Sequence, residues 1–167
     1  MELLDLFVAI QKAWSRETSA DSEHWSTENP AWGQCAATAL VVQDFLGGKL
    51  MRMNLSSSQY PEVAAMRSHY FNRVPMKFGN PEDVDFTKSQ FQDQNEYSKL
   101  RRSAIMIPRE YLLPENPLAE QLKFKARYKA LSLEVARILS NNSPVFENPI
   151  YKDRLALALE SNCAKGK

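Results

Sequence analysis

Residues 33–48 read GQCAATALVVQDFLGG, and this block points to the centre of the fold. Between Cys35 and Leu46 the block is apolar on nearly every side, which is typical of a helix buried inside a protein. Gly47 and Gly48 follow at once, and glycine is favoured just beyond a helix because it tolerates positive φ. The block therefore predicts a buried helix over residues 35–46 that begins at a cysteine.

The residues before this block predict another helix and a long loop. Apolar residues recur at helical spacing between about residues 2 and 15, which predicts an amphipathic helix carrying Leu3, Leu6, Phe7, Ile10 and Trp14. Residues 15–29 are polar and lack periodicity, and Pro30 and Gly33 follow them, so we expect a loop that leads into the Cys35 helix. Residues 1–48 are thus expected to form a helical part.

Beyond the two glycines the pattern changes from helical to alternating. Residues 49–53, 68–74 and 82–87 predict three strands, and the turn residues between them favour an antiparallel sheet within residues 49–91. Asn-Pro pairs at 116–117 and 148–149 predict helix starts, which gives C-terminal helices within residues 116–163, the last of them around Leu155–Leu159. This order predicts an α+β fold in a single domain over residues 1–167.

The charge balance limits the classes of partner. The chain has 167 residues, with 21 Lys and Arg against 20 Asp and Glu, so its net charge is only +1. No strong field draws such a protein to nucleic acid or to an anionic membrane, and we expect neither as a partner. The run Lys123–Lys129 interleaves basic and aromatic residues and is the alternative for single-stranded nucleic acid, but a solvated helix face is the simpler interpretation.

The N-terminal residues and the small number of Cys and His residues predict a cytoplasmic protein without a cofactor. The N-terminal run lacks the features of a secretory signal, and no window reaches the roughly 18 apolar residues that a membrane span needs. The chain has two cysteines, Cys35 and Cys163, and two histidines, His24 and His69. Because no Cys-x-x-Cys or His-x-x-x-His spacing occurs, we expect no metal site.

Cys35 is a candidate nucleophile because of its place at the start of a helix. The helix dipole and the unpaired backbone N–H groups of the first turn favour negative charge there, and the thiolate is the reactive form of cysteine. The alternative is that Cys35 is a small apolar residue of the core, which is a common fate of a free cysteine.

His69 and Asp85 are candidates for the base and for the group that orients it. His69 lies in the expected strand 68–74, and Asp85 lies in the expected strand 82–87 on the face opposite Val84 and Phe86. If the two strands pair, their side chains come within hydrogen-bond reach. Asn72 is the alternative acceptor, although its spacing from His69 places it on the other face of the strand.

Three blocks of this sequence, residues 33–48, 69–72 and 85–91, resemble the small bacterial YunG-type proteins, a family similar to papain-fold cysteine hydrolases. The resemblance implies a papain-like arrangement, in which a Cys helix packs on a small antiparallel sheet. It also implies Cys35 as the nucleophile, His69 as the base and Asp85 as the orienting acid.

The oxyanion donor departs from the papain-like pattern. That pattern has a tryptophan directly after the cysteine and a glutamine several residues before it, whereas here Ala36 follows and Gln34 is adjacent. We therefore expect the backbone N–H of Cys35 to serve, with the side chain of Gln34 or Gln90 as a further candidate.

Two functions follow from these expectations. The first is a cysteine hydrolase or acyltransferase that acts on a small-molecule or peptide acyl substrate through a Cys-His-Asp triad. The alternative is a binding or regulatory module that keeps the same fold and uses the same cleft for a peptide or a small ligand.

Overall fold

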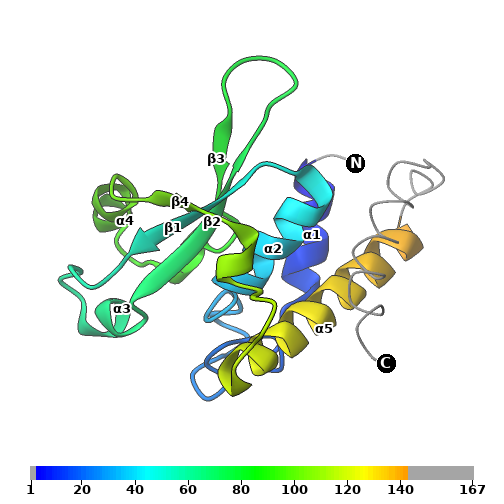
Figure 1. Ribbon diagram of the computed structural model, residues 1–167, viewed down its shortest axis with the longest axis horizontal. Helices are drawn as coiled ribbons and strands as arrows, with labels where there is room; N and C mark the ends of the chain where they lie inside the picture. Colours follow the sequence, from blue (N-terminus) through cyan, green and yellow to red (C-terminus); the bar gives the residue numbers. More distant parts are fainter. Residues whose placement is uncertain (1–2, 143–167) are drawn as a thin grey trace.

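The computed structural model describes residues 3–142, which fold into five α-helices and a four-stranded sheet (Figure 1). The helices are α1 (Leu3–Ala13), α2 (Cys35–Leu46), α3 (Pro61–Ala65), α4 (Gln94–Arg101) and α5 (Ala119–Asn142). The strands are β1 (Lys49–Asn54), β2 (Ser68–Val74), β3 (Glu82–Val84) and β4 (Ile105–Ile107), and two short 3-10 helices are η1 (Lys88–Gln90) and η2 (Arg109–Tyr111). None of these described helices is long and apolar enough to cross a membrane.

The sheet is antiparallel throughout and has the order β3-β2-β1-β4. The predicted α+β class is confirmed, as are the strands predicted over residues 49–53 and 68–74. The strand predicted over residues 82–87 is shorter in the structure, because the ladder with β2 ends at Val84. The sequence patterns gave no indication of α3, α4 or β4.

Helices cover both faces of the sheet, so the central strands β1 and β2 bury side chains on two sides (Figure 1). On one face α1, α2 and α5 pack together with Leu50 of β1, while on the other face α4 packs near Met51. This alternation follows from the period of two along a strand. Double coverage explains why β1 is apolar at adjacent positions.

The Cys35 helix has the predicted limits, residues 35–46, and lies at the centre of the core. Its polar groups are bonded across its packing faces: Trp14 Nε1 donates to Thr38 Oγ1 at 3.0 Å, and Asn72 Nδ2 donates to the Ala39 carbonyl at 2.9 Å. The first bond ties α2 to the end of α1, and the second ties it to β2. These contacts fix the position of the helix start that carries Cys35.

Glycine is required immediately before this helix. Gly33 has φ +71°, and a Cβ atom there would lie 2.3 Å from Ser19 Oγ and 2.9 Å from the backbone nitrogen of Ala20. Such distances are far inside van der Waals contact, so a side chain would displace the loop. The loop of residues 19–21 therefore packs directly against the entry to α2.

A buried polar cluster joins the other end of α2 to α5. Arg109 Nη2 lies 2.8 Å from Asp44 Oδ1 and donates to Tyr128 Oη at 2.8 Å, and Tyr128 Oη in turn donates to Asp44 Oδ2. Burial raises the pKa of Asp44, and the charge and hydrogen bonds of Arg109 and Tyr128 only partly oppose it. The cluster anchors α5 to the core.

The helix predicted from Asn116 begins at Ala119 in the structure, and the one predicted around residues 155–159 lies outside the described residues, as does Cys163. Within the basic run of α5, Tyr128 is buried and Phe124 packs against the core. These two rings face inward, which leaves them unsuited to stacking on nucleic acid bases.

Candidate functional site

Cys35 is half-buried and lines a cleft of about 460 Å³ at the start of α2. The walls come from the loop before α2, from α3 and the residue after it, from the start of β2 and from η1. The lining residues are Ala20, Asp21, Trp32, Gly33, Cys35, Ala36, Glu62, Ala65, Met66, Ser68, Tyr70 and Gln90. The thiol is free, so it is chemically available on the wall of a cavity large enough for a small ligand.

His69 lies near the start of β2 and is fully buried. Its Nε2 lies 2.6 Å from Oδ2 of Asp85, and the ring of Phe91 packs against its edge at a centroid distance of 4.8 Å. The Cys35 side chain lies close enough to His69 to contribute to the raised pKa of the imidazole. The structure thus brings together the three residues that the sequence singled out.

Asp85 lies one residue beyond the end of β3, so it meets His69 from a turn and not from a strand face. Its Oδ1 accepts hydrogen bonds from the backbone N–H and from Oγ1 of Thr87, each at 3.0 Å, and its Oδ2 accepts one from Tyr97 Oη at 2.7 Å. Both carboxylate oxygens are therefore fully bonded, which fixes the orientation of the carboxylate behind the imidazole.

The His69–Asp85 pair is strongly coupled electrostatically. Burial lowers the pKa of His69, but the charge and the hydrogen bond of Asp85, with a further contribution from Cys35, outweigh it and raise the pKa to about 10. Burial raises the pKa of Asp85, but the charge and hydrogen bond of His69 and the bond from Tyr97 lower it overall. At neutral pH these shifts favour an imidazolium paired with a carboxylate.

Gln90 contacts the second nitrogen of the imidazole. Its Nε2 lies 2.9 Å from His69 Nδ1, the side chain is buried, and Oε1 has no hydrogen-bond partner among the described residues. An imidazolium offers only donors, so a charged His69 pairs with Oε1 and leaves Nε2 as the atom without a partner. In either orientation, one polar atom of this cleft-lining amide is left over.

Gln34 is placed differently from Gln90. Its side chain is fully buried behind the start of α2, and its Nε2 donates to the Ser15 carbonyl at 2.9 Å. The amide therefore joins the loop after α1 to the helix start and does not line the cleft.

Asn72, the alternative acceptor, does not contact His69, because its side chain points toward α2 and donates to Ala39. The other histidine, His24, is exposed and pairs with Asp21 at 2.9 Å. Within residues 3–142, no three Cys, His, Asp or Glu side chains are grouped so as to hold a metal ion.

Tyr97 and Thr87 are the site residues that sequence reasoning missed. Asp85 followed by Thr87 is a pattern typical of an Asx turn, so the turn was detectable in the sequence. Tyr97 comes from α4, whose contact with Asp85 depends on tertiary packing that no local pattern reveals.

These features define an α+β protein in which helices pack on a four-stranded antiparallel sheet, a cysteine lines a cleft, and a buried histidine–aspartate pair lies near that cysteine. The chain belongs to the YunG family, whose model, described as YunG protein, matches residues 2–140. It is similar to "Uncharacterized protein YunG" of Bacillus subtilis (strain 168), with 33% identity over 94 residues, or 56% of this chain and 67% of that protein. No solved structure gives a significant match.

Proposed function

We propose that this protein is a cysteine hydrolase or acyltransferase of papain-like arrangement, with Cys35 as the nucleophile. The observation that carries the proposal is that Cys35 on the cleft wall lies close enough to His69 to help raise its pKa, while Nε2 of His69 is held by Asp85 at 2.6 Å. A nucleophile, a base and a residue that orients the base are what acyl transfer by a triad requires.

In the acylation step, the Cys35 thiolate attacks the acyl carbon, a C–S bond forms, and the carbonyl electron pair moves onto oxygen. The tetrahedral adduct then collapses, the bond to the leaving group breaks, and His69 gives its proton to that group. Since Asp85 holds Nε2, the proton passes through Nδ1, the nitrogen on the Gln90 side.

In the second step, water or an acceptor alcohol, amine or thiol attacks the thioester. His69 takes its proton, the C–S bond breaks, and the thiolate is restored. Asp85 stays ionised throughout and stabilises the imidazolium between turnovers.

The oxyanion in this scheme is bound by the backbone N–H of Cys35 and by the side chain of Gln90. The Cys35 N–H belongs to the first turn of α2, whose N–H groups have no partner within the helix. With His69 charged, Gln90 has its Nε2 free to donate. Gln34 is left out, since its amide is already bonded to Ser15.

The first test is thiol reactivity. We expect iodoacetamide to alkylate Cys35 at least about tenfold faster than Cys163, as followed by peptide mass spectrometry, since an adjacent imidazolium increases the thiolate fraction. His69→Ala should remove this advantage, whereas His24→Ala, the matched change at the exposed histidine, should not. Equal rates at the two cysteines, or no response to His69→Ala, would overturn the proposal.

The second test is turnover on a panel of p-nitrophenyl esters, thioesters and aminocoumarin amides. Activity should be lost in Cys35→Ala and kept in Cys163→Ser. Activity that persists in Cys35→Ala excludes Cys35 as the nucleophile. A reactive Cys35 without turnover on any of the three classes favours the alternative, a binding module that uses the same cleft.

A further inference from the structure

The described residues that line the Cys35 cleft include carboxylates but no lysine or arginine. The carboxylates are those of Asp21 and Glu62. Asp21 accepts hydrogen bonds from Trp32 Nε1 and His24 Nδ1, both at 2.9 Å. Burial raises the pKa of Asp21, but these bonds lower it overall, so the group stays ionised.

The two carboxylates are not equivalent. The hydrogen bond and the charge of Asp21 raise the pKa of His24, which favours the protonated imidazole that offsets the Asp21 charge. Glu62 is exposed on α3 and makes no ion pair with any described residue. Glu62 is therefore the uncompensated charge on this wall.

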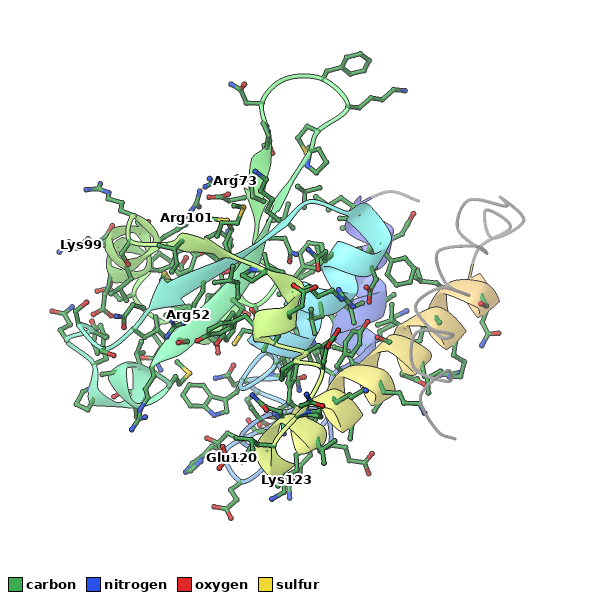
Figure 2. All side chains as sticks on the ribbon, viewed as in Figure 1. Arg52, Arg73, Lys99, Arg101, Glu120 and Lys123 are labelled. Atoms are coloured by element: carbon green, nitrogen blue, oxygen red, sulfur yellow. The ribbon has the colours of Figure 1, made fainter. Side chains whose placement is uncertain are left out.

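The arginines near the sheet are bound elsewhere. Arg52 Nε donates to Ser68 Oγ at 2.9 Å and its guanidinium lies 5.4 Å from the centre of the Tyr111 ring, so it is held behind the cleft wall. Arg73 and Arg101 both bind Asp83 near the far end of β2, where Figure 2 shows them close together. None of these three arginines lines the cleft.

The remaining lining supplies apolar contact and one unsatisfied polar group. Alanines, Met66, Trp32 and Tyr70 offer surface for an aliphatic or peptide chain. Gln90, only 4% exposed, lies beside His69 and has an amide atom without a hydrogen-bond partner among residues 3–142. A buried polar atom of this kind is costly unless a ligand or water binds it, and with His69 charged it is the donor Nε2, which an acyl carbonyl oxygen complements.

We infer that the acyl compound taken by this cleft carries a positive charge, such as a peptide or an amino-acid derivative with a basic side chain, with the cation directed at Glu62. The inference rests on the proposed function for the use of the site. It disfavours acyl phosphates and other anionic acyl donors, because no lining cation would balance their charge and two carboxylates would repel it.

The charge preference can be measured without turnover, by the rates at which thiosulfonates modify Cys35 in a Cys163→Ser background. Each reagent forms a mixed disulfide with the thiolate and releases a sulfinate. The probes are the cationic trimethylammonioethyl, the neutral methyl and the anionic sulfonatoethyl methanethiosulfonates, each referred to its rate with free cysteine. We expect the normalised rate of the cation to exceed that of the anion by about tenfold at 0.1 M salt.

Charge variants test the assignment to Glu62. Glu62→Gln should reduce the cation-to-anion ratio about threefold, and Glu62→Lys should bring it to unity or below. Glu82 provides the matched control. It pairs with Val74 at the other end of β2, about 20 Å along the strand from Ser68. This separation is well beyond the screening length at 0.1 M salt. Glu82→Lys should leave the ratio unchanged.

The outcomes separate this inference from the proposed function. A normalised cation-to-anion ratio of one, or a ratio that does not respond to Glu62→Lys, overturns the inference. Either result leaves the proposed triad untouched. Loss of the His69 dependence of alkylation overturns the proposed function while leaving the charge preference measurable. If amide turnover is found, the substrate with lysine beside the scissile bond should have a higher kcat/KM than its aspartate counterpart, and the reverse order would also overturn the inference.

Discussion

Nε2 of His69 lies 2.6 Å from Oδ2 of Asp85, although neither residue is paired in the ladder between β2 and β3. The carboxylate reaches the imidazole because the chain turns after Val84 and Thr87 holds the other oxygen, Oδ1, through two hydrogen bonds. The pair is buried, with 1% and 5% of the two side chains exposed. This buried His69–Asp85 ion pair therefore affects the stability of the fold as well as the reactivity of the site.

Asp85→Asn should destabilise the protein by about 2 kcal/mol near pH 5.5, because it leaves a buried charged histidine without its counter-ion. The pKa of His69 is raised from 6.5 to about 10, so its contribution is complete below pH 6.5 and is lost as the pH rises toward 10. The pKa of Asp85 is lowered, so its contribution is present above pH 3.8 and is lost as the pH falls further. Urea unfolding of both proteins at pH 5.5 and 9.5 should show a smaller difference at the higher pH.

A difference between wild type and Asp85→Asn that stays constant or grows between pH 5.5 and 9.5 would contradict this charge assignment. Arg73→Gln breaks an exposed contact with Asp83 at the other end of β2 and serves as the control. Its effect should be below about 1 kcal/mol, as for other exposed ion pairs.

Tyr97→Phe should cost about 1 kcal/mol and weaken the acid resistance of the fold. The change removes the hydrogen bond of 2.7 Å from Tyr97 Oη to Asp85 but keeps the ring against Phe91. Since that bond helps to lower the pKa of Asp85, the variant should lose stability at a higher pH than wild type on acidification. Tyr60→Phe, which removes a hydrogen bond to the exposed Asp93, is the matched control, and an equal acid shift in the two variants would argue against the role of Tyr97.

Gly33→Ala should be more destabilising than Gly79→Ala. Both glycines have positive φ, +71° and +93°, but a Cβ at Gly33 would lie 2.3 Å from Ser19 Oγ, while one at Gly79 would meet nothing within 4 Å. We expect a loss of about 1 kcal/mol from backbone strain at Gly79 and about 3 kcal/mol at Gly33, where a clash is added. Thermal unfolding measures the difference, and only Gly33→Ala should slow alkylation of Cys35; similar losses in the two variants would rule out close packing of the loop.

Arg109→Met should destabilise the protein by about 2 kcal/mol, because it leaves the partly buried carboxylate of Asp44 without its counter-ion. The pKa of Asp44 is already raised by burial, and loss of Arg109 should raise it further, so the defect should shrink as the pH falls and Asp44 becomes neutral. Adding Asp44→Asn should restore part of the loss in urea unfolding. A defect that does not depend on pH, or a double variant less stable than Arg109→Met, would exclude this mechanism.

The elements that the sequence predicted well are those whose pattern is local. The Cys35 helix has apolar residues on every side and a glycine stop, and both signals lie within its own sixteen-residue block. By contrast, α4 is mostly polar and buries only Glu96, Tyr97 and Leu100, so no hydrophobic stripe marks it. Its one local signal was Asp93, which accepts hydrogen bonds from the N–H groups of Asn95 and Glu96 as an N-cap.

The short strands depended on tertiary pairing. β4 has three residues and forms because Ile105–Ile107 pair with the edge of β1. Three residues are too few for their alternation to predict a strand. For the site, the period of two correctly separated His69 from Asn72, but it placed Asp85 in a strand that ends before it. The partner of Gln34 is the carbonyl of Ser15, nineteen positions away, which composition and spacing do not reveal.

The short helix α3 gives the two sides of the cleft different tolerances to change. The reacting side is built from α2, β2 and a turn whose atoms are closely bonded, whereas α3 has five residues and buries only Val63. Glu62 and Ala65 project from this one turn into the cleft lining. If Val63 is kept, the other residues of α3 can therefore be exchanged. Such substitutions would change the ligand preference of the cleft without altering Cys35 and His69.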